Sequence, residues 1–355
     1  MKILVTGDRG YIGAVMVPTL LGEGHAVFGL DCYWFEQCAF GELRTAIPKK
    51  QKDIRDLNGS DLEGFDAVVH LAGLSNDPLG DLNPAVTYEI NHVASVRLAR
   101  LAKENGVQRF IFSSSCSIYG AAGEDGVLTE EAELHPVTAY ARAKALVEED
   151  VAKLGDSSFS PTFLRNATAY GMSPMLRFDL VLNNLVAWAV TTGRIRIKSD
   201  GTPWRPIVHV EDICRAFVAV LNAPRELIHC EAFNVGTTDE NYRIRDLANI
   251  VHEIVPDCRV DYAKDGGPDK RCYRVDFGKL AKRFPTFKPL WNARKGARQV
   301  YDAIRAVGLR INDFEGSRYQ RISHIRHLIN KKCLDGNLRW IESVGTDGRR
   351  LQTVA

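Results

Sequence analysis

The sequence predicts an α/β fold, a doubly wound parallel sheet joined to a smaller mixed α/β region. Short apolar runs alternate with helical stretches through the first 165 residues, which is the pattern of successive βαβ units. The runs are continuous and not alternating, as is typical of strands buried on both faces of a sheet. From Arg194 onward the segments become shorter and more mixed, which indicates the second region.

The elements of the first region follow in order along the chain. Five apolar runs are the expected strands: Lys2–Thr6, Ala26–Leu30, Ala67–Leu71, Arg109–Phe112 and Thr162–Arg165. Three stretches of helical composition separate them: Val15–Leu21, Ala85–Lys103 and Pro136–Glu149. Gly106 is expected to end the second of these helices. Pro136 suits the first position of the third, because it lacks the N–H that would be unpaired there.

Composition excludes several classes of protein. The 355 residues predict one large α/β unit with an appended part, or two domains. Lys plus Arg number 46 and Asp plus Glu 44, a balance that argues against a nucleic-acid partner. No apolar run reaches membrane-spanning length, and the N-terminal run is too short for a signal peptide. The eight scattered cysteines form no CxxC pair, which predicts reduced thiols in a cytoplasmic protein.

A glycine-rich turn directly follows the first strand. Gly7, Gly10 and Gly13 have the spacing at which glycines permit a tight turn, close approach of a pyrophosphate and packing of the next helix. The helix N-terminus then offers free N–H groups to phosphates. Asp31 ends the second strand, 18 residues past Gly13, where a carboxylate accepts hydrogen bonds from ribose hydroxyls. It would repel a 2′-phosphate, so we expect NAD and not NADP, although Arg9 in the loop could soften that preference.

A Ser, Tyr and Lys constellation follows the fourth strand. Tyr140 and Lys144 lie four residues apart and therefore share one helix face. Ser113-Ser114-Ser115 ends the strand before that helix, at the sheet edge where catalytic groups gather. A nearby ammonium lowers the pKa of a phenol, so the pair can exchange a hydroxyl proton with substrate while hydride moves to or from nicotinamide.

Six motifs of the sequence resemble those of a known family. They are Thr6–Gly13 (TGDRGYIG), Asp53–Asp56 (DIRD), His70–Gly73 (HLAG), Phe112–Gly120 (FSSSCSIYG), Tyr140–Lys144 (YARAK) and Arg205–Asp212 (RPIVHVED). In this order and spacing the chain resembles the extended short-chain dehydrogenase/reductase family, in its sugar-nucleotide branch, over roughly residues 1–276. The resemblance implies a Rossmann fold, NAD as cofactor, a nucleotide-diphosphate sugar as substrate and no metal.

The resemblance also implies roles for individual residues. Ser115 is the catalytic serine, Tyr140 the acid/base, and Lys144 its partner, which also touches the nicotinamide ribose. The other implied cofactor contacts are Gly7, Gly10, Tyr11, Ile12, Gly13, Asp31, Asp53, Ile54, Leu71, Ala72, Gly73 and Asn166. The implied substrate contacts, besides Ser115, are Thr168, Asn184, Arg205 and, as a weaker candidate, Arg271. His209 is expected to be structural.

Two departures bear on the reaction. Asn166-Ala167-Thr168 stands where relatives often carry Tyr or Phe followed by Asn, which leaves the sugar contacts there open. Cys116 and Ser117 stand where the 4,6-dehydratase branch has Asp and Glu. We therefore expect an epimerase acting at C4 through a transient keto sugar. A 4-keto-sugar reductase, a dehydratase and a non-catalytic NAD-sensing scaffold stay open as alternatives.

The expected organisation has two domains and two subunits. Residues 1–165 form the NAD-binding domain, to which 207–235 return, and 166–206 with 236–355 form the substrate-binding domain and the C-terminal tail. Relatives of this kind pair through two long helices, so we expect a homodimer with a bundle built from Ala85–Lys103 and Pro136–Leu154. The basic stretch Arg318–Lys332 is interpreted as a solvated surface helix.

Overall fold

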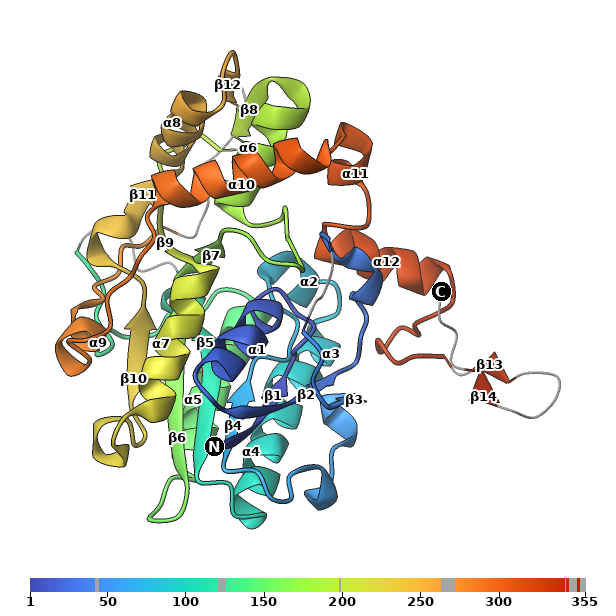
Figure 1. The fold of residues 1–355 in the computed structure, drawn as a ribbon, viewed down its shortest axis with the longest axis vertical. Coiled ribbons are helices and arrows are strands. Elements are labelled where there is room, and N and C mark those ends of the chain that lie inside the picture. Colours follow the sequence, from blue (N-terminus) through green and yellow to red (C-terminus); the bar gives the residue numbers. More distant parts are fainter. Residues whose placement is uncertain are drawn as a thin grey trace.

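A seven-stranded parallel sheet organises the N-terminal part of the chain (Figure 1). The computed structural model describes residues 1–41, 45–120, 126–197, 199–262, 272–341, 343–344 and 350–351. In the order of the sheet the strands are β10 (Ala232–Val235), β6 (Ser160–Asn166), β5 (Arg109–Ser115), β4 (Ala67–His70), β1 (Lys2–Thr6), β2 (Ala26–Asp31) and β3 (Lys49–Gln51). From β1 the chain first adds β2 and β3 on one side and then crosses over to add β4 on the other side. The connections that leave β1 and β4 therefore run in opposite directions, and a crevice opens at the carboxyl ends of these two strands. The predicted doubly wound sheet is confirmed.

Helices cover both faces of this sheet. One face carries α1 (Gly13–Gly22) and α7 (Val210–Asn222), and the other carries α5 (Ala139–Ala152) beside a continuous helical stretch, 84–104. That stretch consists of α3 (Pro84–Tyr88), a π-helical segment (Glu89–Ala94) and α4 (Ser95–Glu104). Along β1, Ile3 and Val5 face the first layer of helices while Leu4 faces the second. This burial on both faces explains the continuous apolar run.

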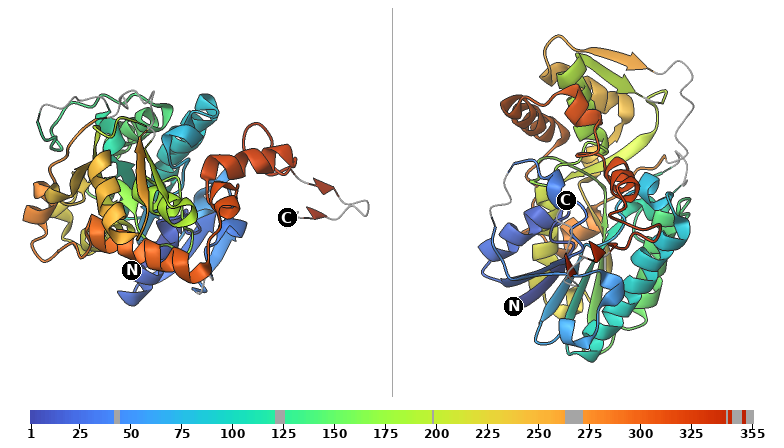
Figure 2. Two further views of the ribbon diagram at one scale, coloured as in Figure 1. Left: turned by 90° about the horizontal axis from the view of Figure 1, so that it is seen from above. Right: turned by 90° about the vertical axis from the view of Figure 1, so that its right-hand side faces the viewer.

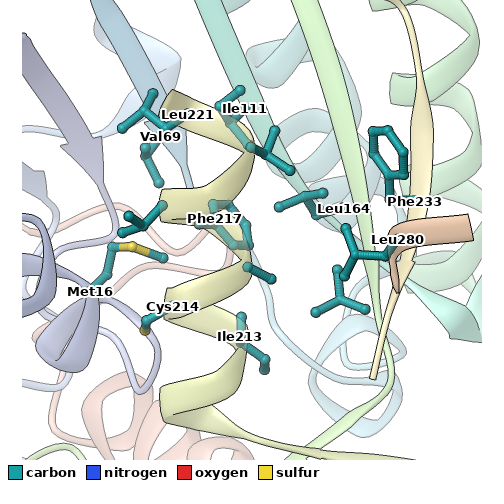
Figure 3. Close-up of a cluster of buried hydrophobic side chains, with 14 of the residues drawn as sticks. Met16, Val69, Ile111, Leu164, Ile213, Cys214, Phe217, Leu221, Phe233 and Leu280 are labelled. Atoms are coloured by element: carbon teal, nitrogen blue, oxygen red, sulfur yellow. The ribbon is translucent and has the colours of Figure 1, made fainter. Parts of the chain in front are cut away.

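The core beneath α7 links the two ends of the sheet (Figure 3). Phe217 of α7 is fully buried and packs in one cluster with Met16 of α1, Ile111 of β5 and Leu164 of β6. Residues far apart in sequence therefore hold the strands in register, and α7 with β10 returns the chain to the large sheet after residue 209.

Helix α5 begins three residues later than Pro136, where we placed its start. Thr138 is the N-cap: its Oγ1 accepts a hydrogen bond from the Ala141 N–H, 3.1 Å away. The first N–H groups of a helix have no partner within the helix. A threonine whose side chain accepts from one of them fixes the start of the helix more strongly than a proline, which only lacks such an N–H itself. The shift does not change the relation of Tyr140 to Lys144, because both remain in the helix.

The smaller region is mixed, as predicted. Its three-stranded sheet orders β11 (Asn241–Arg243), β9 (Trp204–His209) and β7 (Thr168–Tyr170), with one antiparallel and one parallel pair. The remaining strands are β8 (Arg194–Ile197), paired with β12 (Arg259–Tyr262), and β13 (Ser343–Val344), paired with β14 (Arg350–Leu351). The remaining helices are α2 (Asp77–Gly80), α6 (Val181–Thr192), α8 (Ile244–Ile254), α9 (Gly278–Arg283), α10 (Ala293–Val307), α11 (Ile311–Glu315) and α12 (Arg321–Asn330).

Helix α12 packs on the surface, as expected, with Arg326 and His327 exposed, and it buries one face. Arg321 and His324 are buried, and Ile325 joins the core cluster on the β2 side of the large sheet. His324 Nε2 lies 2.8 Å from the Trp34 carbonyl oxygen, and Trp340 Nε1 donates to the Cys32 carbonyl oxygen at 2.7 Å. The C-terminal segment therefore folds back onto the first region (Figure 2). Among the residues that the structure describes, no helix combines the length and apolarity needed to cross a membrane.

Candidate active site

The glycine turn has the shape that a diphosphate requires. Gly7 has a φ of +77°, in the left-handed region that favours glycine, and its N–H donates to the Leu30 carbonyl oxygen at 2.7 Å. A Cβ on Gly13 would overlap with the Gly7 carbonyl oxygen, so only glycine lets α1 start this close to the turn. The turn and the α1 N-terminus leave a cradle with outward N–H groups that fits the phosphates of a dinucleotide.

Two carboxylates lie beside this turn, and the sequence singled out only one. The Asp31 carboxylate accepts hydrogen bonds from the N–H of Tyr33 at 2.8 Å and of Arg9 at 3.2 Å. Asp8 is buried against Gly29, and burial with the neighbouring charge of Asp31 raises its pKa to about 7. Asp31 lines the cofactor cavity described below, whereas Asp8 lies behind the turn and forms an ion pair with Arg9 at 3.6 Å.

A narrow cavity of about 120 Å³ gathers the predicted cofactor residues of the first region. Its lining includes Gly7, Gly10, Tyr11, Ile12, Gly13, Asp31, Asp53, Ile54, Leu71, Ala72 and Gly73, and also Arg177 and Arg321, which the sequence analysis did not identify. Asp53 also forms an ion pair with Arg55 at 2.7 Å. We call this cavity the cofactor half of the cleft.

A second cavity, of about 770 Å³, adjoins the first and shares part of its lining. It brings together Ser115, Tyr140, Lys144, Asn166, Thr168, Asn184 and Arg205. We call it the substrate half. Arg271, the weaker candidate, lies outside the described residues. Asn184 Nδ2 donates to the Phe178 carbonyl oxygen at 2.7 Å, and Arg205 Nη1 to the Trp204 carbonyl oxygen at 2.7 Å.

Tyr140 and Lys144 project from α5 toward the end of β5. Ser115, the last residue of β5, lines the same cavity as Tyr140, and its side chain acts to lower the pKa of the Tyr140 phenol. Lys144 Nζ donates to the Ser113 carbonyl oxygen at 2.7 Å and lies 5.8 Å from the centre of the Tyr140 ring. Asn166 of β6 continues the polar row, donating from Nδ2 to Ser113 Oγ at 3.0 Å, while its Oδ1 is buried without a partner among the described residues.

The pKa of Tyr140 is raised, whereas we expected the nearby Lys144 to lower it. Burial raises the pKa of Tyr140 to about 12, and the polar side chain of Ser115 and the charge of Arg177 offset this only in part. Burial also lowers the pKa of Lys144 to about 7, so its ammonium is only partly populated near neutral pH. Desolvation thus outweighs the attraction between ammonium and phenolate. The phenol is protonated in the protein alone, and the positive charge of an oxidised nicotinamide would favour its ionisation.

A buried ion pair that the sequence analysis missed fixes the position of α5. Glu148, one helical turn after Lys144, accepts from Arg165 of β6 at 2.7 and 3.0 Å. Ser114 Oγ also donates to the Glu148 carboxylate. The only signal in the sequence was the i,i+4 spacing, which puts Tyr140, Lys144 and Glu148 on one face. Glu148 therefore anchors the helix that carries the acid/base candidate to two strands of the sheet.

Cys116 and Ser117 are poorly placed to supply acid or base. The Cys116 thiol is fully buried and donates to the Arg165 carbonyl oxygen at 3.1 Å. Burial raises the pKa of Cys116 far above its ordinary value, so no thiolate forms at neutral pH. Ser117 Oγ has no hydrogen-bond partner within the described ranges and therefore no base beside it. Cys116 has the role of a small buried residue.

His209 is structural, in agreement with our expectation. Its Nδ1 accepts from the Glu211 N–H at 3.2 Å and caps α7, while its ring stacks on Trp291 with centroids 4.0 Å apart. Over the part of the chain that the structure describes, no group of three or more His, Cys, Asp or Glu side chains could hold a metal ion.

Comparisons with known proteins agree with this geometry. The model of the NAD-dependent epimerase/dehydratase family matches residues 3–236. UDP-glucose 4-epimerase 4 of Oryza sativa subsp. japonica is 31% identical over 265 residues, 66% of this chain and 72% of the relative. UDP-glucose 4-epimerase of Homo sapiens is 28% identical over 276 residues, covering 66% and 77%.

Solved structures extend the similarity in three dimensions. MoeE5 in complex with UDP-glucuronic acid and NAD has a TM-score of 0.74 at 25% identity, covering 86% of this chain and 100% of that one. The NDP-hexosamine 5,6-dehydratase TunA has a TM-score of 0.76 at 22% identity, covering 86% and 98%, which supports the fold alone. Part of this chain thus has no counterpart in either structure.

Proposed function

This chain belongs to the NAD-dependent epimerase/dehydratase family, and from that premise we propose that it is a sugar-nucleotide epimerase acting at C4. The observation that carries the proposal is the placement of Tyr140 with Ser115 and Lys144 in the substrate half, which shares part of its lining with the cofactor half. The cofactor of the family is NAD, and the cradle at Gly7–Gly13 with Asp31 fits it. A scaffold that only sensed NAD would have no need of Ser115, Tyr140 and Lys144 together.

Proton transfer is the task of Tyr140. NAD, when bound, accepts a hydride from the sugar carbon and can return it to either face. Tyr140 takes the proton of the hydroxyl on that carbon and later gives it back to the same oxygen. Ser115 holds this oxygen through its hydroxyl. Lys144 stabilises the phenolate that forms, and Glu148 keeps the helix in place for both.

The cavity accommodates the turn of the sugar that epimerisation requires. Its volume of about 770 Å³ lies in the ~300–1,000 Å³ range of small-molecule sites and exceeds what one hexose ring needs. We assign the substrate diphosphate to Asn184, Arg205 and Arg271, because a guanidinium donates two charge-assisted hydrogen bonds to a phosphate. The relatives that are 4-epimerases of UDP-glucose favour a UDP-hexose.

The two positions that follow Ser115 do not supply the groups that dehydration needs. Loss of water requires an acid for the leaving hydroxyl and a base for the neighbouring C–H, both beside the catalytic serine. The thiol of Cys116 is buried with a strongly raised pKa, and Ser117 has no base next to it among the described residues. Epimerisation needs neither, so these two positions favour the epimerase.

Product analysis tests the reaction. The purified full-length protein is incubated with UDP-, dTDP-, GDP- and CDP-hexoses without added NADH, and the sugars are followed by NMR. We expect the C4 epimer of at least one hexose, and its formation at a strongly reduced rate by Tyr140→Phe as the matched control. A 4-keto-6-deoxy sugar would establish a dehydratase instead. A strict requirement for stoichiometric NADH would establish a reductase.

We also propose a homodimer paired through α5 and the helical stretch 84–104. Val93 in that stretch has 58% of its surface exposed, an apolar side chain on the face that a four-helix bundle would cover. Light scattering at micromolar concentration should give twice the chain mass, and Val93→Glu should give a larger monomer fraction. A monomeric wild-type protein would contradict the proposal.

A further inference from the structure

Helix α12 contributes a buried guanidinium to the cofactor half of the cleft. Arg321, the first residue of α12, has only 2% of its surface exposed and lines the same cavity as Gly10 and Asp31. Residue 321 lies beyond the part of the chain that the family model matches, 3–236. No motif in the sequence connected this helix to the cofactor.

The contacts of Arg321 leave part of its hydrogen-bonding capacity unused. Its Nη2 donates to the Met175 carbonyl oxygen at 3.1 Å, and the guanidinium lies 4.2 Å from the centre of the Phe35 ring. Its Nη1 is buried and has no hydrogen-bond partner, and within the described ranges no carboxylate lies at ion-pair distance. A buried donor without an acceptor costs free energy, so an anion at this point would be stabilising.

A second buried arginine, Arg177, lies next to it. Arg177 forms a bidentate pair with Asp179, at 2.9 and 3.0 Å, and its Nη1 donates to Ser75 Oγ at 3.1 Å. It lines both halves of the cleft. Burial and the positive charge of Arg177 lower the pKa of Arg321 to about 10, which still leaves Arg321 charged at neutral pH. Of the two guanidiniums, only that of Arg177 is thus directly bound to a carboxylate.

We propose that Arg321, together with Arg177, binds the diphosphate of NAD. Both line the cavity that the α1 N-terminus enters, and a diphosphate offers acceptor oxygens and negative charge to the unpaired Nη1. The proposal rests on the cofactor position inferred above from Gly7–Gly13 and Asp31. It makes the C-terminal helix a part of the cofactor site and gives a reason for the burial of Arg321 at the start of a basic surface helix.

The size of the cavity agrees with a covering role for α12. At about 120 Å³ the cofactor half is smaller than the ~300 Å³ lower end of ordinary ligand pockets. Phe35 and Arg321 both line it and contact each other. Helix α12 therefore forms part of the wall of the cofactor half, where the Arg321 side chain packs against Phe35.

Binding measurements on the full-length, cofactor-stripped protein test the proposal with NAD, ADP and adenosine as probes. Arg321→Met should weaken NAD and ADP by the same factor, about tenfold to a hundredfold, and leave adenosine unchanged. Arg326→Met is the matched control, because Arg326 is an exposed arginine on the same helix. It should change none of the three affinities. Thermal unfolding without ligand checks that each variant is folded.

The outcomes separate this inference from the cofactor position. If Arg321→Met binds ADP as tightly as the wild type, Arg321 is not a phosphate ligand. If it loses adenosine equally, Arg321 acts through the ribose or through packing, which also overturns the proposal. If Asp31→Ala fails to weaken NAD, the cofactor position itself is wrong. Should Arg321→Met not fold, Arg321→Lys replaces it, with a smaller loss for ADP and none for adenosine.

Discussion

The two halves of the cleft are built from different kinds of segment. The cofactor half takes most of its lining from the first 73 residues, where a turn and three strand ends follow one another closely. The substrate half collects side chains from β5, α5, β6, α6 and β9, and extends to residues near 320. A short stretch of chain thus defines one half, whereas the other depends on many separate segments.

This difference follows from the topology of the sheet. Parallel strands bring their carboxyl ends to one edge of the sheet. The residues that end the neighbouring strands β1, β2 and β4 therefore come together as soon as these three strands pair. The smaller sheet and the loops that shape the substrate half are fixed only by long-range packing. Substitutions in the two halves should therefore separate cofactor binding from turnover.

The largest effect is expected from Tyr140 in the substrate half. Tyr140→Phe should reduce turnover by about 10²–10⁴-fold, since a positioned acid/base contributes that much. NAD affinity should stay nearly unchanged because the ring remains. Steady-state kinetics and NAD titration measure the two quantities on one preparation. More than about a tenth of the wild-type turnover would exclude Tyr140 as the acid/base.

Next in size is the effect of Asp31→Ala, confined to the cofactor half. Loss of hydrogen bonds between a carboxylate and the ribose should weaken NAD by about tenfold to a hundredfold. Discrimination against NADP should relax at the same time, because a repelling charge is gone. Direct titration with both dinucleotides gives the ratio. A wild-type protein that binds NADP at least as well as NAD would refute the role of Asp31.

A smaller effect is expected from Arg205→Ala in the substrate half. Removing a guanidinium from the substrate phosphates should raise KM by about tenfold, while the NAD content of the purified protein stays that of the wild type. Arg326→Ala, an exposed change, serves as the control. A loss of NAD without a change in KM would show that the two halves are not separable in this way.

The smallest effect concerns the stability of the glycine turn. The pKa of Asp8 is about 7 in the folded protein against its ordinary 3.8, so between these values the folded state binds more protons than the unfolded state. Stability from this group is therefore complete below about pH 4 and is lost as the pH rises to about 7.

Asp8→Asn removes that titration. Its free energy of unfolding, relative to the wild type, should increase by at least about 1 kcal/mol between pH 4 and 7, the equivalent of one pKa unit. Urea unfolding of the cofactor-free proteins at several pH values measures it. Parallel pH profiles for the two proteins would show that the Asp8 carboxyl is not perturbed.

The sequence alone determined the parts that depend on local backbone requirements. Gly7, Gly10 and Gly13 are needed for a turn that a Cβ would obstruct, and the i,i+4 spacing of Tyr140 and Lys144 places both on one helix face wherever the helix begins. The alternation of apolar runs and helices likewise predicted the sheet, because strands buried on both faces must be apolar throughout.

Only the tertiary structure decided the rest, because burial and long-range contact have no local signature. The ion pair of Glu148 with Arg165 joins a helix to a strand, and Arg321 reaches the cofactor half from a helix whose composition indicated only a surface position. The raised pKa of Tyr140 has the same origin: the sequence showed its cationic neighbour but not the desolvation that outweighs it.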